Sequence, residues 1–138
     1  MASTQEYAAT KVMFSNNVQA TLSVKLINGD GEDPAQVYGS ITGRFGISNQ
    51  FSLFNRPQSQ RIDVRPGEFI PLSQPSVNVP EAADAMEITA YLMDYDTLSP
   101  DDEIANGTVT FLVRGPGVEE KQPINGKYGS IEVNVTWG

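Results

Sequence analysis

The amino-acid sequence predicts an all-β protein, an antiparallel β-sandwich of about eight strands. Several segments alternate apolar and polar residues with a period of two, which is typical of half-buried strands. Gly, Pro, Asn and Asp interrupt these segments at short intervals, and no segment shows the periodicity of an amphipathic helix. The clearest alternation closes the chain, where Ile131, Val133, Val135 and Trp137 share one face.

The chain is expected to contain one domain. Residues 1–10 are small and polar, which predicts a loose arm, and residues 11–138 are expected to form a single β-sandwich. Gly39 and Gly43 fall on the inward face of one segment, which predicts a bend or a close approach by another backbone. The expected strands lie at 11–15, 18–26, 37–47, 50–54, 60–64, 68–72, 86–92, 109–113 and 131–137. The expected core comprises Val18, Leu22, Val24, Leu26, Ile41, Phe45, Ile88, Leu92, Phe111, Val133, Val135 and Trp137.

The composition excludes several functions. The chain of 138 residues carries 17 acidic and 9 basic side chains, and a net charge of −8 disfavours binding to nucleic acid. Histidine and cysteine are absent, which removes Ser-His-Asp and Cys-His catalysis, disulfides, and imidazole or thiolate zinc sites. A carboxylate pair that hydrolyses sugars needs a cleft lined by aromatic residues, whereas the one tryptophan lies in an expected core strand. The chain is therefore not expected to be an enzyme.

The sequence also bears on location. No apolar run is long enough to cross a bilayer, so no transmembrane segment is expected. The start of the sequence has no basic stretch followed by an apolar one, as a secretory signal would have. Together with the absence of cysteine, this predicts a cytoplasmic protein.

One acidic stretch, residues 92–107, is the strongest candidate for a binding site. It is predicted to be a strand, a loop with five carboxylates (Asp94, Asp96, Asp101, Asp102 and Glu103) and a returning strand. Five carboxylates so close together repel one another unless water or a hard cation neutralises them. Calcium takes six to eight oxygen ligands from a flexible cage, which such a loop supplies. The alternative is a solvated acidic turn without a metal.

The acidic loops resemble those of C2 domains, the β-sandwiches that bind calcium and often phospholipid. In the third calcium loop of that family, Asp-x-Asp is followed by another Asp and then by x-Ile-Gly. Asp94, Asp96, Asp102 and Ile104 match this pattern, although Ala105 replaces the glycine. The family's first calcium loop ends in Asp-Pro, as does the segment 28–34, in which Asp30 and Asp33 are the candidate acids. The resemblance implies a C2-like sandwich that binds calcium through Asp30, Asp33, Asp94, Asp96 and Asp102.

A fainter resemblance is to a plant β-domain of unknown function that is sometimes joined to ribosome-inactivating toxins. It rests on the residues 29–31, on the run 37–41 and on the late Asp-Asp-Glu-Ile at 101–104. This resemblance implies no known activity. The chain is too short to contain a toxin domain as well.

Two functional hypotheses follow. In the first, the protein is a calcium-dependent binding module whose acidic loops chelate a cation and present a surface to lipid, protein or carbohydrate. In the second, it is a metal-free structural or interaction β-sandwich that self-assembles into a homo-oligomer or serves as an accessory domain. Thermal unfolding with calcium and with a chelator distinguishes the two, because a cation that binds only the folded state must stabilise it.

Overall fold

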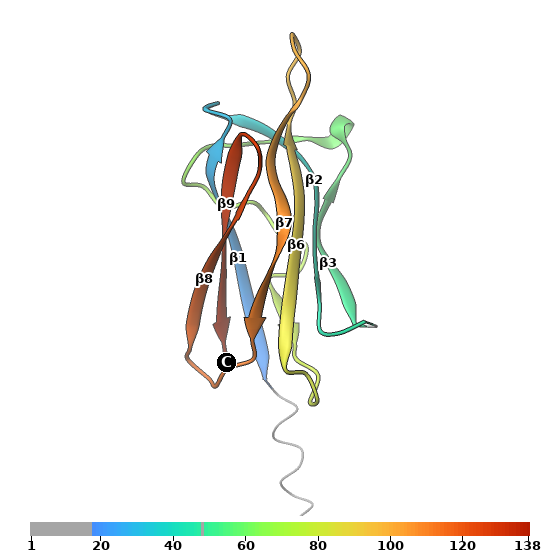
Figure 1. The fold of residues 1–138 in the computed structure, drawn as a ribbon, viewed down its shortest axis with the longest axis vertical. Helices are drawn as coiled ribbons and strands as arrows, with labels where there is room; N and C mark the ends of the chain where they lie inside the picture. Colours follow the sequence, from blue (N-terminus) through green and yellow to red (C-terminus); the bar gives the residue numbers. More distant parts are fainter. Residues whose placement is uncertain (1–17, 48) are drawn as a thin grey trace, which may run out of the picture.

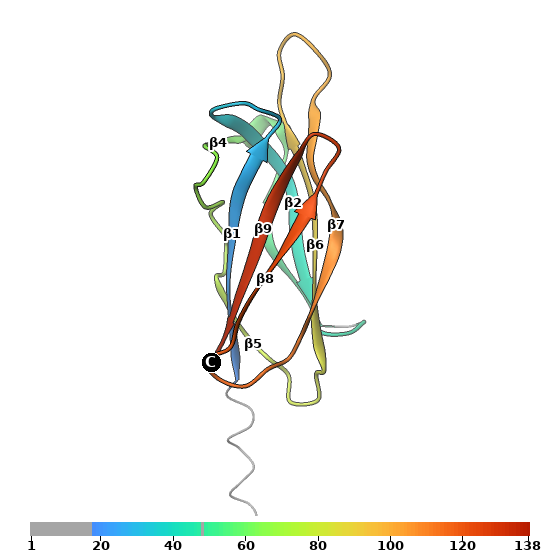
Figure 2. The ribbon, with the colours of Figure 1, turned by 60° about the vertical axis from the view of Figure 1, so that its left-hand side comes forward.

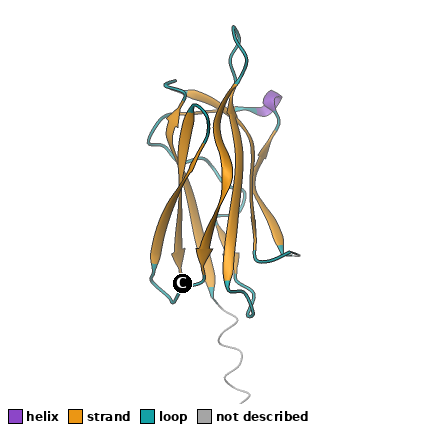
Figure 3. Cartoon of the chain, in the orientation of Figure 1, coloured by secondary structure: helices purple, strands orange, loops and turns teal. Residues whose placement is uncertain are grey.

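The computed structural model describes residues 18–47 and 49–138. The expected arm at 1–10 and the expected short strand at 11–15 lie outside the described residues. Within them, nine strands form two antiparallel sheets that pack face to face (Figure 1). The predicted fold class, an all-β antiparallel sandwich, is confirmed. Colouring by secondary structure shows strands throughout and one short helical turn (Figure 3).

The first sheet has four strands in the order β5-β1-β9-β8. Its long central pair, β1 and β9, are the two segments with the clearest alternation in the sequence, and they pair from Ala20↔Trp137 to Gly29↔Gly129. The bounds of these strands are β1 (Gln19–Gly29), β5 (Ser76–Asn78), β8 (Glu119–Asn125) and β9 (Gly129–Trp137).

The second sheet has five strands, in the order β3-β2-β6-β7 with β4 also paired to β2. A 3-10 helix, η2 (Gln58–Gln60), connects β3 to β4. The bounds are β2 (Ala35–Arg44), β3 (Gln50–Arg56), β4 (Ile62–Val64), β6 (Ala85–Asp94) and β7 (Asp102–Leu112).

The core lies between the two sheets, as the alternation predicts. Of the twelve expected core residues, eleven are buried, and Val18 is partly buried and packs against them. Trp137, Phe111 and Leu26 are among the largest side chains that are fully buried. The period-two pattern therefore identified the inward face of every long strand that it predicted.

Both inward glycines are positions where another group approaches closely. Gly39 has a φ of 125°, and a Cβ built on it would lie 2.1 Å from the carbonyl oxygen of Tyr91 on β6. A Cβ on Gly43 would lie 2.4 Å from the ring of Phe51 on β3. The predicted close approach by another backbone is confirmed at Gly39, whereas the group that approaches Gly43 is an aromatic side chain.

Some expected strands differ from the structure. The segment 68–72 is not a strand and makes only an isolated bridge between Phe69 and Lys25. Conversely, β8 was not predicted, because only Ile124 of its seven residues is buried and its sequence includes Pro123. A proline is compatible with β8, since this strand lies at the edge of its sheet.

The acidic loop is also shorter than predicted. Asp94 is the last residue of β6 and Asp102 the first of β7, so the loop comprises only residues 95–101. Main-chain pairing opposite Val37 and Asp102 therefore fixes the position of Asp94. The turn after β1 lies at the same end of the sandwich as this loop (Figures 1 and 2).

Candidate metal centre

Strand pairing brings the two acidic segments together. The backbone N–H of Gln36, at the start of β2, donates a hydrogen bond of 2.8 Å to Oδ1 of Asp94 at the end of β6. The turn after β1 is closed by the side chain of Asn28, whose Oδ1 accepts from the N–H of Gly31 at 2.9 Å. Asp30 has a left-handed φ of 63° in this turn, a conformation that Asp adopts more readily than most residues. The turn thus places its acids beside the end of β6.

The acids that meet here form what we call the acid cluster: Asp30, Glu32, Asp94 and Asp102. Carboxylate oxygens of Asp30, Glu32 and Asp94 lie within 4.8 Å of one another. Asp102 pairs with Asp94 across the β6–β7 ladder, and its carboxyl is hydrogen-bonded to that of Asp30. Two separate segments of the chain therefore contribute two acids each to one small volume.

The environment of the acid cluster opposes ionisation. Burial raises the pKa of Asp94 to about 6, and the negative charges of Glu32 and Asp102 add to this effect, while the Gln36 hydrogen bond acts against it. The pKa of Asp30 is also raised to about 6, first by the hydrogen bond to Asp102 and then by desolvation and neighbouring negative charge. Asp94 is only 2% exposed, so little water screens it.

In the described part of the chain, the ion pairs leave the charge of the acid cluster uncompensated. The ion pairs between described residues connect Arg44 with Glu87, Arg65 with Asp33, and Arg114 with Glu120, none of which belongs to the acid cluster. The cluster is therefore a concentration of negative charge with one buried member.

The structure brings three of the five predicted ligands together, namely Asp30, Asp94 and Asp102. The other two point to different partners. Oδ1 of Asp33 pairs with Nη1 of Arg65 at 3.1 Å on the exposed surface. Oδ1 of Asp96 accepts from the N–H of Leu98 at 3.1 Å, within its own loop. A metal-binding role of all five residues stays a prediction.

Sequence reasoning missed Glu32 as a member of the acid cluster. The signal was present, because Glu32 lies two residues after Asp30 in a turn already considered as a calcium loop. The C2 resemblance instead implies Asp33, in the Asp33-Pro34 pair, as the ligand of this turn beside Asp30. Whether Glu32 or Asp33 faces β6 depends on the course of the turn, which the sequence pattern does not specify.

The 95–101 loop is fixed at its base by Asp101. The hydroxyl of Tyr38 donates to Oδ2 of Asp101, as does Nε2 of Gln58 at 2.7 Å, and the N–H of Asp96 donates to Oδ1 at 3.0 Å. Although burial acts to raise it, the pKa of Asp101 is lowered by these hydrogen bonds. The pKa of Tyr38 is raised to about 12, by burial and by the adjacent Asp101. At the tip of the loop, Leu98 is 95% exposed.

The chemistry of the acid cluster suits a hard cation. Carboxylate oxygens are the ligands that calcium and magnesium prefer, and each carboxylate can contribute one or two oxygens. Calcium tolerates irregular geometry and high coordination numbers, which carboxylates on a turn and two strand ends can provide. Magnesium requires near-ideal octahedral geometry and usually retains several waters.

Fold and site define this chain as a two-sheet antiparallel β-sandwich with an acid cluster at one end. The chain belongs to the family described as a domain of unknown function (DUF6598), whose model matches residues 6–135. No curated protein sequence matches the chain. The resemblance to a plant β-domain stays a prediction.

Three solved structures that are similar to this chain have very different sequences. One is a chain in the crystal structure of the Cry23Aa1 and Cry37Aa1 binary protein complex, at 15% identity, with a TM-score of 0.56 over 88% of this chain and 97% of that chain. Another is a C2 domain, at 13% identity, with a TM-score of 0.40 over 87% of this chain and 94% of that chain. A third is the C2A domain of plant Extended Synaptotagmin 1, at 8% identity, with a TM-score of 0.38 over 88% and 94%. At 15% identity, the first of these similarities bears on the fold alone.

Among the helices of the described residues, none is long and apolar enough to span a membrane.

Proposed function

We propose that this protein is a calcium-dependent binding module. The observation that carries the proposal is the convergence of four carboxylates from two chain segments, one of them buried, without a basic side chain among their ion-pair partners in the described structure. Such a group is unfavourable as it stands, because the neighbouring negative charges help to raise the pKa of Asp30 and of Asp94. A divalent cation bound between the turn at 30–32, the end of β6 and the start of β7 would attract all of these carboxylates and so replace their mutual repulsion by a favourable interaction.

Cation binding would act on the surface at the same end of the molecule. Asp102 belongs to the acid cluster, and its neighbour Asp101 holds the base of the 95–101 loop. A cation that fixes Asp102 therefore also restrains the loop that carries Leu98. Neutralising the acids lowers the repulsion of anionic partners, so the loop can approach a lipid, protein or carbohydrate surface.

The test is thermal unfolding with millimolar calcium, with magnesium and with a chelator, followed by calorimetric titration with calcium. A cation at a hundredfold excess over its dissociation constant stabilises the folded state by about 2.7 kcal/mol. Asp94→Asn should abolish this gain, whereas Asp33→Asn should retain it, because Asp33 pairs with Arg65 outside the acid cluster. An unfolding temperature that calcium leaves unchanged would refute the proposal.

A second candidate is a metal-free interaction sandwich that assembles with copies of itself or acts as an accessory domain. It is favoured by the similarity to a chain that was solved within a binary protein complex. Sedimentation of the protein with chelator present tests it. This reading requires self-association or partner binding to be insensitive to calcium. Neither candidate includes a catalytic step.

A further inference from the structure

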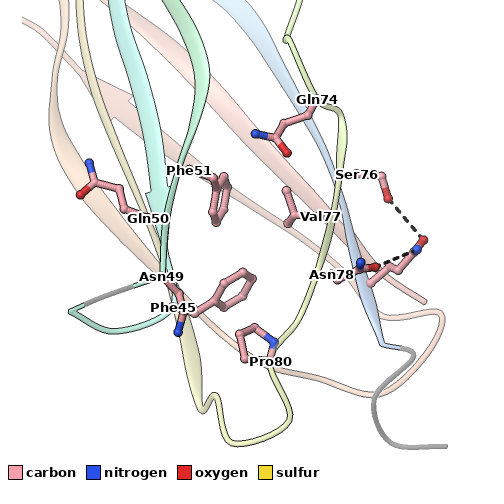
Figure 4. A pocket seen from close by; sticks show the side chains of 10 residues that line it. Phe45, Asn49, Gln50, Phe51, Gln74, Ser76, Val77, Asn78 and Pro80 are labelled. Carbon is pink, nitrogen blue, oxygen red and sulfur yellow. Dashed lines mark hydrogen bonds between the residues drawn. The ribbon is translucent and has the colours of Figure 1, made fainter.

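A second candidate site lies at the opposite end of the sandwich from the acid cluster. Here β3, at the edge of one sheet, and β5, at the edge of the other, leave a cleft between them (Figure 4). The cleft has a volume of about 470 Å³. This lies within the range of small-molecule sites, roughly 300–1,000 Å³.

One wall of the cleft is aromatic. The rings of Phe45 and Phe51 lie 5.6 Å apart between centroids and are tilted by 36°. Phe45 is buried, whereas Phe51 is only partly buried and faces the side of the cleft formed by Val77 (Figure 4). The ring of Phe51 is seated against Gly43, where a side chain would collide with it. The cleft therefore offers a positioned aromatic face to a ligand.

The β5 side of the cleft is uncharged: Val77 points toward the ring of Phe51, whereas Ser76 and Asn78 point to the other side of the strand (Figure 4). Nε2 of Gln19 donates to Oδ1 of Asn78 at 3.1 Å, and the hydroxyl of Ser76 donates to Oε1 of Gln19 at 3.3 Å. Nε2 of Gln74 donates to the carbonyl of Ser52 at 3.0 Å. An amide side chain has two N–H donors and a carbonyl with two lone pairs, so these bonds orient the groups and leave hydrogen-bonding capacity free.

The charge of the cleft limits the class of ligand. None of the residues that line it, all within the described chain, has an ionisable side chain. The chain as a whole has a net charge of −8, so an anionic ligand would be repelled without a basic group to hold it. A purely apolar ligand would displace water from several amides without replacing their hydrogen bonds, which is unfavourable. The class of ligand that remains is uncharged and has hydroxyl groups as well as an apolar face.

We propose that this cleft binds an uncharged saccharide of one or two pyranose rings, independently of calcium. Sugar hydroxyls donate and accept at once, as does the amide of Gln74, which lies on the same side of the chain as the ring of Phe51 (Figure 4). The C–H face of a pyranose ring is apolar and can stack on the partly exposed ring of Phe51. The aromatic ring and the amide thus match the two chemical faces of one class of ligand.

Saturation-transfer NMR and amide chemical-shift titration of the whole protein in chelator test this inference. The probes are glucose, galactose, mannose and N-acetylglucosamine at millimolar concentration, with sorbitol as a polyol that has no ring. At least one sugar should bind, shifting amides of β3 and β5, and sorbitol should not. Failure of every sugar, shifts at the acid cluster instead, or equal binding of sorbitol would overturn the proposal. Because chelator is present throughout, this result is separate from the test of calcium binding.

Matched variants locate the site. Phe51→Ala should weaken binding about tenfold, as expected for loss of an aromatic contact, whereas Phe69→Ala, on an exposed ring outside the cleft, should leave it unchanged. If Phe51→Ala fails to fold, Gln74→Ala serves instead. Its control is Gln122→Ala, which likewise removes a single side-chain bond to a backbone carbonyl, that of Thr110. Wild-type binding by Gln74→Ala would place the sugar elsewhere and refute the proposal.

Discussion

Replacing Asp94 by Asn tests the acid cluster most directly. The change keeps the shape of the side chain and the oxygen that accepts from the N–H of Gln36. It removes one buried negative charge that faces Glu32 and Asp102. In the presence of chelator, we therefore expect the variant to be more stable than the wild-type protein at neutral pH.

The size of this gain follows from the pKa of Asp94. The folded protein raises that pKa from 3.8 to about 6, and one pKa unit corresponds to about 1.4 kcal/mol. Keeping Asp94 ionised at neutral pH thus costs up to about 3 kcal/mol relative to the unfolded chain. Water at the rim of the sandwich relieves part of this cost, so we expect a gain of about 1–3 kcal/mol. The unfolding temperature should rise by several degrees.

The assay is urea unfolding of both proteins at neutral pH, with chelator and then with calcium. Calcium should stabilise the wild-type protein and have little effect on Asp94→Asn, which reverses their order of stability. Asp33→Asn is the control: its exposed pair with Arg65 contributes at most about 1 kcal/mol, and its response to calcium should remain. If Asp94→Asn is less stable than the wild-type protein in chelator, the reasoning from buried charge is wrong.

Three further predictions concern pH, the core and one glycine. In chelator, unfolding experiments should find the wild-type protein more stable near pH 5 than at pH 7. The pKa values of Asp30 and Asp94 are raised in the folded state, which therefore still binds protons at a pH where the unfolded state has released them. This proton binding stabilises the folded state, and the stabilisation is lost as pH rises through about 6. A free energy of unfolding that increases from pH 5 to pH 7 would contradict this prediction. Leu26→Ala should cost about 2–5 kcal/mol in urea unfolding and Val24→Ala less, since it removes fewer buried carbons; negligible costs at both would mean that they do not face the core. Gly39→Ala should cost more than about 2 kcal/mol, because its φ of 125° and the facing carbonyl leave no room for a Cβ; a near-wild-type midpoint would refute this.

The fold was predictable wherever burial alternates along a strand. The long strands β1, β2, β6 and β9 each have one face in the core, and their apolar residues recur with a period of two. The pattern fails for β8, where Ile124 alone is buried. It also fails for the segment around Ile70, which is buried although the chain there is not a strand. The hydrophobic pattern therefore indicates which residues are buried. It indicates a strand only where the buried residues also belong to one.

The sequence was sufficient to predict where the candidate site lies, but not which acidic residues meet there. Asp94 and Asp102 flank a hairpin loop, so pairing of β6 with β7 had to bring them together. The acids of the turn after β1 are different, because their directions depend on backbone torsions such as the left-handed φ of Asp30. Asp33 and Glu32 are adjacent, yet one faces Arg65 and the other the acid cluster. A sequence pattern gives the residues of a turn but not their orientations.

The acid cluster breaks a rule that the rest of the fold obeys. In the core, local pattern and tertiary structure agree: the alternating apolar residues of the long strands are buried, and Gly39 and Gly43 occupy positions that exclude a side chain. At Asp94, an ionisable group is buried beside other acids, and its raised pKa shows that the folded state bears the cost. Places where a stable fold retains a locally unfavourable arrangement are where function is expected. Under the proposed function, a cation would offset this cost, because the negative charges that repel one another would then attract the cation.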